Sequence, residues 1–220
     1  MSATAPDRTR RQTYLAELFR QTRVIPVITI ENVEHALPLA RALVAGGLRC
    51  LEITLRTSAA PAAVEAIAEN VPEATVGVGT VLTPDDLAYA RSLGAHFALS
   101  PGAFPKLLDA AADDELPFVP GIATPSELMA ALERGFDILK FFPAAPLGGI
   151  ATLRALGGPF PHVHFCPTGG IGEADLPQWL ALPNVIAVGG SWLTPLGDMH
   201  AGHWNAITDR ARRALAAIGK

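Results

Sequence analysis

Cysteine and aromatic residues are scarce in this chain of 220 residues. Two cysteines, Cys50 and Cys166, are too few for a disulfide scaffold or for a zinc site with four thiolate ligands. Three tryptophans, two tyrosines and nine phenylalanines leave few platforms on which single-stranded nucleic acid could stack. Charged residues make up only 17% of the chain and the formal net charge is -4, so we expect no nucleic-acid partner.

Long apolar runs are absent as well. No run approaches the ~20 residues that a helix needs to span a bilayer. The first dozen residues are basic but are not followed by an apolar segment, which argues against a secretory signal. We therefore expect no membrane partner and a cytoplasmic location. Half of the residues are hydrophobic, which suits one domain over residues 1–220, with a flexible segment at about residues 1–12.

Short apolar runs rich in β-branched residues alternate with amphipathic, alanine-rich segments, and turn residues separate them. The predicted strands are residues 24–30, 49–55, 74–80, 96–100, 117–121, 138–142, 162–168 and 185–189. The predicted helices include residues 33–45, 61–69, 85–93 and 125–134, and an extra N-terminal helix at 14–20. Eight strand–helix units in a chain of this length predict an α/β fold, a (β/α)8 TIM barrel.

A doubly wound open sheet is the alternative fold. Its dinucleotide fingerprint needs three spaced glycines at the start of a helix, and Gly77-x-Gly79 lacks the third glycine. The predicted helix ends have ordinary signals: Thr83 and Thr124 stand before a proline as N-caps, and Gly46-Gly47, Gly94 and Gly135 follow helices as left-handed caps.

Lysine is rare, with three lysines against fourteen arginines. Lys140 lies between apolar residues in the sixth predicted strand, whereas Lys106 and Lys220 lie in a helical and a terminal segment. An edge-strand lysine that reaches out to water is one explanation. A buried lysine is the other, because burial favours the neutral amine, which attacks carbonyl carbons to form a Schiff base.

Polar side chains also mark the second and third predicted strands. Alternation places Glu52, Thr54 and Arg56 on one face, which faces the lumen of a barrel. A buried Glu52–Arg56 ion pair is a purely structural explanation. The functional interpretation gives proton transfer to Glu52 and lets Arg56 bind a substrate carboxylate, with help from the Thr80 hydroxyl.

Two glycine pairs end the last two predicted strands, in Thr168-Gly169-Gly170 and in Gly189-Gly190-Ser191. Exposed backbone amides of this kind hold anions, and phosphate sites recur at these strands in barrels. A metal site is not predicted: His162-x-His164 and His200-x-x-His203 have no convincing third ligand. Cys166 is expected to be a small residue that fills the lumen.

The chain resembles the family of bifunctional 2-keto-3-deoxy-6-phosphogluconate/4-hydroxy-2-oxoglutarate aldolases. The resemblance runs in chain order over residues 24–193. The motifs that carry it are Val-Ile-Pro-Val at 24–27, Leu-Glu-Ile-Thr-Leu-Arg-Thr at 51–57, Gly-Thr-Val-Leu at 79–82, Ser-Pro-Gly at 100–102, Pro-Gly-Ile at 120–122, Lys-Phe-Phe-Pro-Ala at 140–144, Phe-Cys-Pro-Thr-Gly-Gly-Ile at 165–171 and Gly-Gly-Ser-Trp-Leu at 189–193.

This resemblance implies a class I aldolase of the Entner–Doudoroff pathway, a homotrimer that uses no metal or other cofactor. It implies that Lys140 forms the Schiff base and that Glu52 is the acid and base. The implied substrate-binding residues are Arg56 and Thr80 for the pyruvyl carboxylate, Phe142 for the pyruvyl end, Gly169, Gly170, Gly190 and Ser191 for the phosphate, and also Pro101 and Thr168. Ala145 stands where relatives often have an acidic residue.

Two other functions stay open at this point. A phosphosugar isomerase or epimerase on the same barrel would use Glu52 as its base and Lys140 as a non-covalent contact. A non-catalytic barrel that binds a phosphorylated metabolite would show no turnover. The motifs at 55–57 and 189–192 favour substrates of gluconate over galactonate stereochemistry.

Overall fold

The computed structural model describes residues 5–220, and all strand pairs in it are parallel. One sheet has six strands in the order β5-β4-β3-β2-β1-β9, and the other has three in the order β6-β7-β8. The strands are β1 (Val24–Ile28), β2 (Cys50–Thr54), β3 (Thr75–Gly79), β4 (Phe97–Leu99), β5 (Phe118–Val119), β6 (Gly121–Ile122), β7 (Ile138–Phe141), β8 (His164–Pro167) and β9 (Val188–Gly190).

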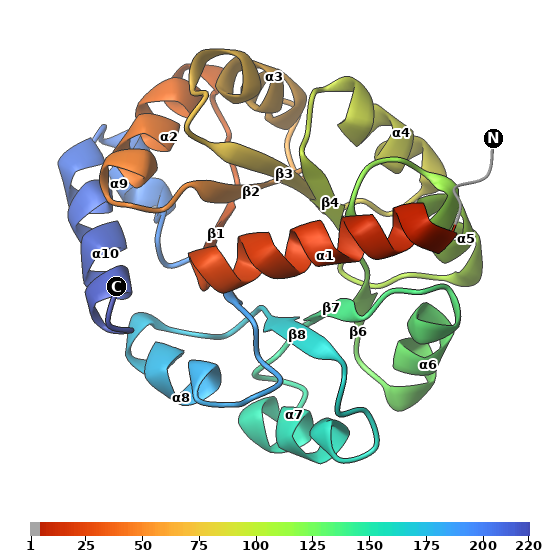
Figure 1. Cartoon of the computed structure of the whole chain (residues 1–220). Coiled ribbons are helices and arrows are strands. Elements are labelled where there is room, and N and C mark those ends of the chain that lie inside the picture. Colours follow the sequence, from red (N-terminus) through yellow and green to blue (C-terminus); the bar gives the residue numbers. More distant parts are fainter. Residues whose placement is uncertain (1–4) are drawn as a thin grey trace.

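Helices alternate with the strands along the chain and lie outside them (Figure 1). The α-helices are α1 (Ala5–Thr22), α2 (Ala36–Ala45), α3 (Ala60–Asn70), α4 (Pro84–Ser92), α5 (Pro105–Asp113), α6 (Pro125–Glu133), α7 (Gly149–Gly157), α8 (Leu176–Leu180), α9 (Leu196–His200) and α10 (Trp204–Ala216); η1 (Val33–His35) and η2 (Glu173–Asp175) are 3-10 helices. None of the helices in residues 5–220 combines the length and the apolar character that crossing a bilayer requires.

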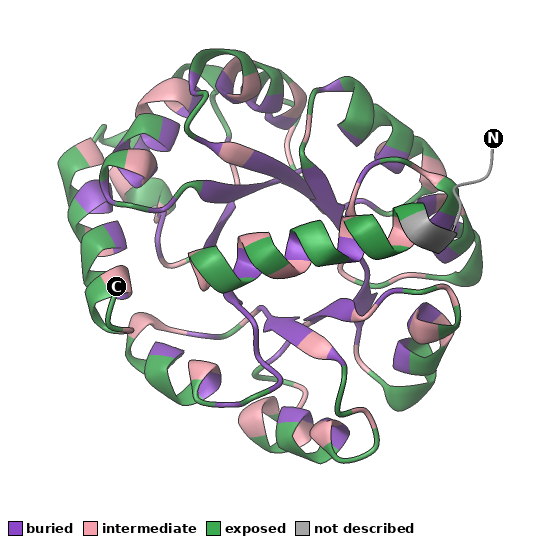
Figure 2. Cartoon of the chain, viewed as in Figure 1, coloured by how far each residue is buried: buried purple, intermediate pink, exposed green. Residues whose placement is uncertain are grey.

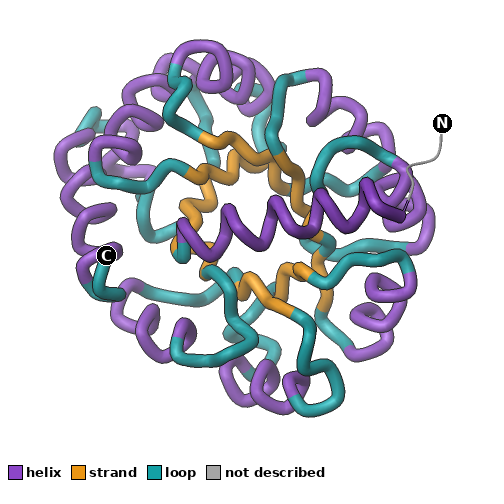
Figure 3. Tube along the Cα trace, viewed as in Figure 1, coloured by secondary structure: helices purple, strands orange, loops and turns teal. Residues whose placement is uncertain are grey.

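The strands of both sheets surround a common centre (Figure 3). Strands β5 and β6 are separated by Pro120 alone. The predicted strand 117–121 is therefore two short strands, because proline has no N–H with which to continue the ladder. The Pro120 carbonyl still accepts a hydrogen bond of 2.9 Å from the Lys140 amide. At the other junction, an isolated parallel bridge pairs Thr168 with Gly189.

Two hydrophobic clusters hold the elements together, and Figure 2 shows the strands almost wholly buried. The larger cluster lies between the strands and the surrounding helices, and the smaller one lies inside the ring of strands. Alternation assigns the sides: Leu51 and Ile53 belong to the outer cluster, whereas Cys50 belongs to the inner one. The polar lumen face predicted for the second strand is thus the face that carries Cys50 and Glu52.

Helix α1 lies across one end of the ring (Figure 1). Its Leu15 and Phe19 side chains are fully buried in the inner cluster, and Gln12 accepts hydrogen bonds from the amides of Asp137 and Ile138 at the start of β7. The helix begins well before the predicted 14–20 segment. The flexible segment expected at residues 1–12 is wrong for residues 5–12, which are helical, and residues 1–4 lie outside the described residues.

The predicted helix caps are confirmed, except at Gly46. Thr83 and Thr124 each accept a hydrogen bond from the third residue of the following helix, and that acidic residue bonds back to the cap amide, so both form capping boxes. Gly47, Gly94 and Gly135 have positive φ angles, where a side chain would be strained. The prediction is wrong for Gly46, which has a φ of -82° and ends α2 in a right-handed conformation.

Replacing Thr124 by alanine should lower the free energy of unfolding by about 1 kcal/mol, because the amide of Glu127 loses its acceptor. Urea denaturation measures the change. Ser126→Ala, in the first turn of the same exposed helix end, is the matched control and should not lower stability. An equal loss in both variants would contradict the assigned capping role.

Candidate active site

The predicted site residues gather at the carboxyl ends of the strands. In a parallel sheet these ends share one edge; here it is opposite α1, which packs against the starts of β2 and β7. Arg56 follows β2, Thr80 follows β3, Pro101 follows β4, Phe142 follows β7, Thr168, Gly169 and Gly170 follow β8, and Gly190 and Ser191 end and follow β9.

Lys140 and Glu52 form a buried ion pair. The Lys140 Nζ donates a hydrogen bond of 2.7 Å to the Glu52 Oε1, and the two side chains are only 4% and 2% exposed. Lys140 therefore does not reach out to water. The Glu52 carboxylate pairs with the Lys140 amine and not with the Arg56 guanidinium, so the alternative Glu52–Arg56 ion pair is wrong. Burying two charges costs free energy unless they pair with each other, and the contact between Lys140 and Glu52 provides that pairing.

Gly79 makes room for the Glu52 carboxylate. A Cβ atom at this position would lie 2.2 Å from Oε1, closer than any real contact. Glu52 pairs in register with Gly77, and Gly79 pairs with Thr54. The missing side chain at the end of β3 therefore lets Glu52 turn toward Lys140.

Phe142 borders the amine. Its ring centroid lies 5.8 Å from the Lys140 Nζ, and the peptide bond that follows it, to Pro143, is cis. A Cβ atom on Gly169 would be 3.3 Å from the ring edge. The Phe142 ring is therefore close both to the Lys140 amine and to Gly169, in the turn after β8. This position is the one expected of a residue that contacts the reacting end of a substrate.

Three polar side chains at the rim lack partners among residues 5–220: Arg56, Thr80 and Ser191. Arg56 is exposed in the turn after β2. Thr80 has a φ of 65°, an unusual left-handed conformation for a β-branched residue. The Gly79 carbonyl before it and the Val81 amide after it are both hydrogen-bonded, to Leu55 and Leu99. Such strain is typical of functional sites.

The two glycine turns lie next to each other. The Thr168–Gly189 bridge joins the ends of β8 and β9, and a Cβ atom on Gly189 would meet the Thr168 hydroxyl at 2.3 Å. Gly169 and Gly170 have positive φ angles, and within the described chain their amides donate to no acceptor. Free amides in this arrangement suit an anion.

Pro101 lies against the strand beside Lys140. A Cβ atom on Gly121 would be 2.3 Å from the Pro101 carbonyl carbon, and Gly121 is the register partner of Lys140. Ser100, fully buried, accepts a hydrogen bond of 3.1 Å from the Gly121 amide. These contacts fix the backbone on one side of the lysine.

The two cysteines are inert fillers of the inner cluster. Burial raises the pKa of Cys166 to about 12, although the nearby Lys140 charge acts in the opposite direction. Burial also raises the pKa of Cys50 well above its usual value. Cys166 is the register partner of Lys140 on β8, which confirms the predicted lumen-filling role.

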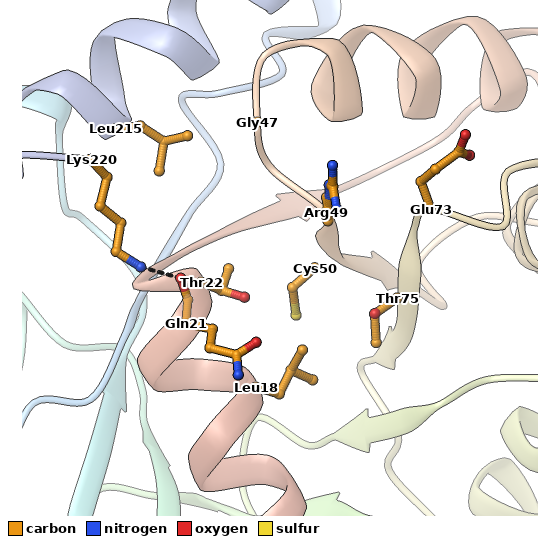
Figure 4. Close-up of a pocket in the computed structure, with 10 residues that line it drawn as sticks. All are labelled: Leu18, Gln21, Thr22, Gly47, Arg49, Cys50, Glu73, Thr75, Leu215 and Lys220. Carbon is orange, nitrogen blue, oxygen red and sulfur yellow. Dashed lines mark hydrogen bonds between the residues drawn. The ribbon is translucent and has the colours of Figure 1, made fainter.

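The histidine pairs are not brought together as metal sites: no cluster of three His, Cys, Asp or Glu side chains suited to a metal occurs in the described part of the chain. A cavity of about 390 Å³ lies at the opposite end of the strands, beside the end of α1 (Figure 4). Arg49, Cys50, Glu73 and Lys220 are among its lining residues, and none of the predicted substrate-binding residues is.

Gly79 and Trp192 also belong to the site, although no sequence pattern assigns them to it. The Trp192 ring covers Gly190 so closely that a Cβ atom there would lie 1.6 Å from a ring carbon. Both positions lie within the quoted motifs, but only the three-dimensional arrangement shows what they contact.

Parallel strands with a buried lysine–carboxylate pair at their carboxyl ends define an α/β protein suited to covalent chemistry on a carbonyl compound. The model of the aldolase family described as "KDPG and KHG aldolase" matches residues 15–210. The chain belongs to this family.

Two proteins illustrate the similarity. The KHG/KDPG aldolase of Escherichia coli (strain K12) is 52% identical over 192 residues, which cover 87% of this chain and 90% of that protein. The crystal structure of the KDPG aldolase from Legionella pneumophila, with pyruvate captured as a covalent carbinolamine intermediate, is 46% identical with a TM-score of 0.89 and covers 90% of this chain and 97% of that one.

A third relative binds a phosphorylated compound. The aldolase of Zymomonas mobilis ZM4 was solved with 3-phosphoglycerate; it is 40% identical with a TM-score of 0.85, covering 90% of this chain and 93% of that one.

Removing one partner of the buried pair should destabilise the protein more than removing both. Lys140→Met leaves the Glu52 charge buried without a partner and should lower the free energy of unfolding at pH 7 by about 3–5 kcal/mol. The double variant Lys140→Met/Glu52→Leu should recover much of that loss, as measured by urea denaturation. A double variant that loses the sum of the two single effects would contradict this coupling.

Proposed function

We propose that this chain is a class I aldolase. It cleaves 2-keto-3-deoxy-6-phosphogluconate to pyruvate and glyceraldehyde 3-phosphate, and 4-hydroxy-2-oxoglutarate to pyruvate and glyoxylate. The observation that carries the proposal is the 2.7 Å contact between the Lys140 Nζ and the Glu52 Oε1 in a buried site. An amine next to a proton acceptor, shielded from water, is what Schiff-base formation needs.

The reaction begins when Lys140 passes a proton to Glu52 and the neutral amine attacks the C2 ketone. Glu52 returns its proton to the carbinolamine hydroxyl, which leaves as water and gives an iminium that accepts the electron pair of the C3–C4 bond as that bond breaks. Glu52, again a carboxylate, takes the proton of the C4 hydroxyl, directly or through water, and later delivers it to C3 of the enamine. Hydrolysis of the imine then releases pyruvate and restores Lys140.

The rim residues hold the two ends of the substrate. Arg56 and Thr80, which have no partner within residues 5–220, bind the pyruvyl carboxylate. Phe142 packs on the pyruvyl end, and Pro101 and Thr168 complete the pocket walls. The free amides of the Gly169–Gly170 turn, with Gly190 and Ser191, bind the phosphate. Fixing both ends positions the scissile bond.

The relatives support this reaction rather than the alternatives. The covalent carbinolamine of the Legionella protein and the 3-phosphoglycerate of the Zymomonas protein match the two halves of the proposed site. None of the relatives reported above is named as an isomerase, an epimerase or a binding protein. Because the Lys140 amine supplies the electron sink through its iminium, the proposed reaction needs no metal or other cofactor.

We further propose that the two sheets form one closed (β/α)8 barrel. Counting β5 and β6 as one strand interrupted at Pro120 leaves eight strands in residues 5–220. The bond from the Lys140 amide to the Pro120 carbonyl supports closure on one side, and the Thr168–Gly189 bridge supports it on the other. A homotrimer in the cytoplasm is the assembly and location that the family resemblance implies; sedimentation analysis tests the assembly.

Lys140→Arg should abolish cleavage of both substrates, measured as pyruvate release in a coupled assay. Glu52→Gln should retain formation of the pyruvate imine, detected by borohydride reduction and intact mass, while kcat falls by about 10²–10⁴-fold. Cys166→Ala, in the same inner cluster, is the control that should keep most activity. Near wild-type turnover in Glu52→Gln would refute the acid–base role.

A further inference from the structure

Two threonine hydroxyls meet one step nearer the mouth than Glu52. The register pairs Val27 with Glu52 and Ile28 with Ile53, so Thr29, the first residue after β1, stands opposite Thr54. The two Oγ1 atoms are 3.2 Å apart. By alternation both side chains lie on the face of the sheet that carries Glu52. Thr54 is fully buried, whereas Thr29 is only partly buried.

The hydrogen-bond directions in this pair are determined by Thr54. Its hydroxyl donates to the Ile28 carbonyl at 2.9 Å. A hydroxyl has a single hydrogen, so in the contact between the two threonines Thr29 must be the donor. As long as it donates to Thr54, the Thr29 hydroxyl has no hydrogen left for a ligand and offers only acceptor lone pairs. A ligand group that contacts it without breaking this bond is a hydrogen-bond donor.

Strand β1 separates the two halves of the proposed site. It pairs with β2, which carries Glu52, and with β9, where Pro26 is the register partner of Gly190. In the proposed function the substrate is held by its carboxylate at Arg56, after β2, and by its phosphate near Gly190, in β9, so its middle carbons lie at the end of the intervening strand β1, where Thr29 stands. In the six-carbon phosphorylated substrate C5 carries a hydroxyl, which can donate. In 4-hydroxy-2-oxoglutarate C5 is a carboxylate, which only accepts.

We propose that Thr29 determines substrate preference by accepting a hydrogen bond from the C5 hydroxyl of the phosphorylated substrate and by disfavouring a carboxylate at that place. The inference rests on the proposed function. It assigns Thr29 to specificity and leaves the bond-breaking step to Lys140 and Glu52.

Thr29→Val keeps the shape and removes the acceptor. The kcat/KM for 2-keto-3-deoxy-6-phosphogluconate should fall about tenfold, the typical effect of one lost hydrogen bond. The kcat/KM for 4-hydroxy-2-oxoglutarate should stay unchanged or rise. Thr29→Ser should restore the wild-type ratio. Thr208→Val is the matched control, because the Thr208 hydroxyl in α10 also bonds a backbone carbonyl, that of Ala42, and its loss should leave the ratio unchanged.

The quantity that tests the role of Thr29 is the ratio of kcat/KM for 2-keto-3-deoxy-6-phosphogluconate to kcat/KM for 4-hydroxy-2-oxoglutarate. An unchanged ratio in Thr29→Val, an equal fall for both substrates, or the same change in Thr208→Val would overturn the role of Thr29. Thr29→Ala serves as a second variant without the hydroxyl if the valine does not fold. A wild-type protein that cleaves neither substrate would instead refute the proposed function itself.

Discussion

Lys140 and Glu52 are buried together within the ring of parallel strands, and the surrounding residues are arranged to accommodate this pair. Each charge would be costly to bury alone, and the 2.7 Å contact between them offsets that cost. In the proposed reaction the same contact passes a proton from the amine to the carboxylate, so the interaction that makes burial tolerable would also prepare the nucleophile. Stability and the proposed chemistry therefore depend on one pair of side chains.

The neighbours of this pair are shaped around it. Gly79 leaves the space that the Glu52 carboxylate occupies, and Gly121, the register partner of Lys140, lets the Pro101 backbone approach. Because all the strands are parallel, the groups after their carboxyl ends converge on the same rim. Polar side chains and amides without partners among residues 5–220 remain there, at Arg56, Thr80 and the Gly169–Gly170 turn, where the proposed substrate supplies the missing partners.

Much of the fold could be predicted because each pattern has a local physical cause. The alternation along residues 49–55, the capping boxes at Thr83 and Thr124, and the glycines after helices each depend on a few neighbouring residues. The fifth predicted strand, 117–121, is split at Pro120 because proline has no N–H to continue the ladder. The proline itself is visible in the sequence. The part of α1 before residue 14 depends on contacts that are distant in the chain: Arg11 donates to the Ala112 carbonyl, and Gln12 accepts from the first amides of β7.

The candidate site was predictable for a different reason. A lone lysine in an apolar strand and a glutamate among alternating apolar residues are local anomalies, so Lys140 and Glu52 stand out without a structure. That they pair with each other, rather than Glu52 with Arg56, depends on two strands that are not paired in either sheet but bring together residues 88 apart in the chain, and it could not be derived from spacing. The roles of Gly79 and Thr29 likewise depend on which strands are neighbours.

Peptide mapping after borohydride reduction in the presence of pyruvate tests the central claim most directly, because the chain has only three lysines. The account predicts one reduced pyruvyl adduct on the peptide that contains Lys140. An adduct on Lys106 or Lys220, or no adduct in an active enzyme, would contradict it.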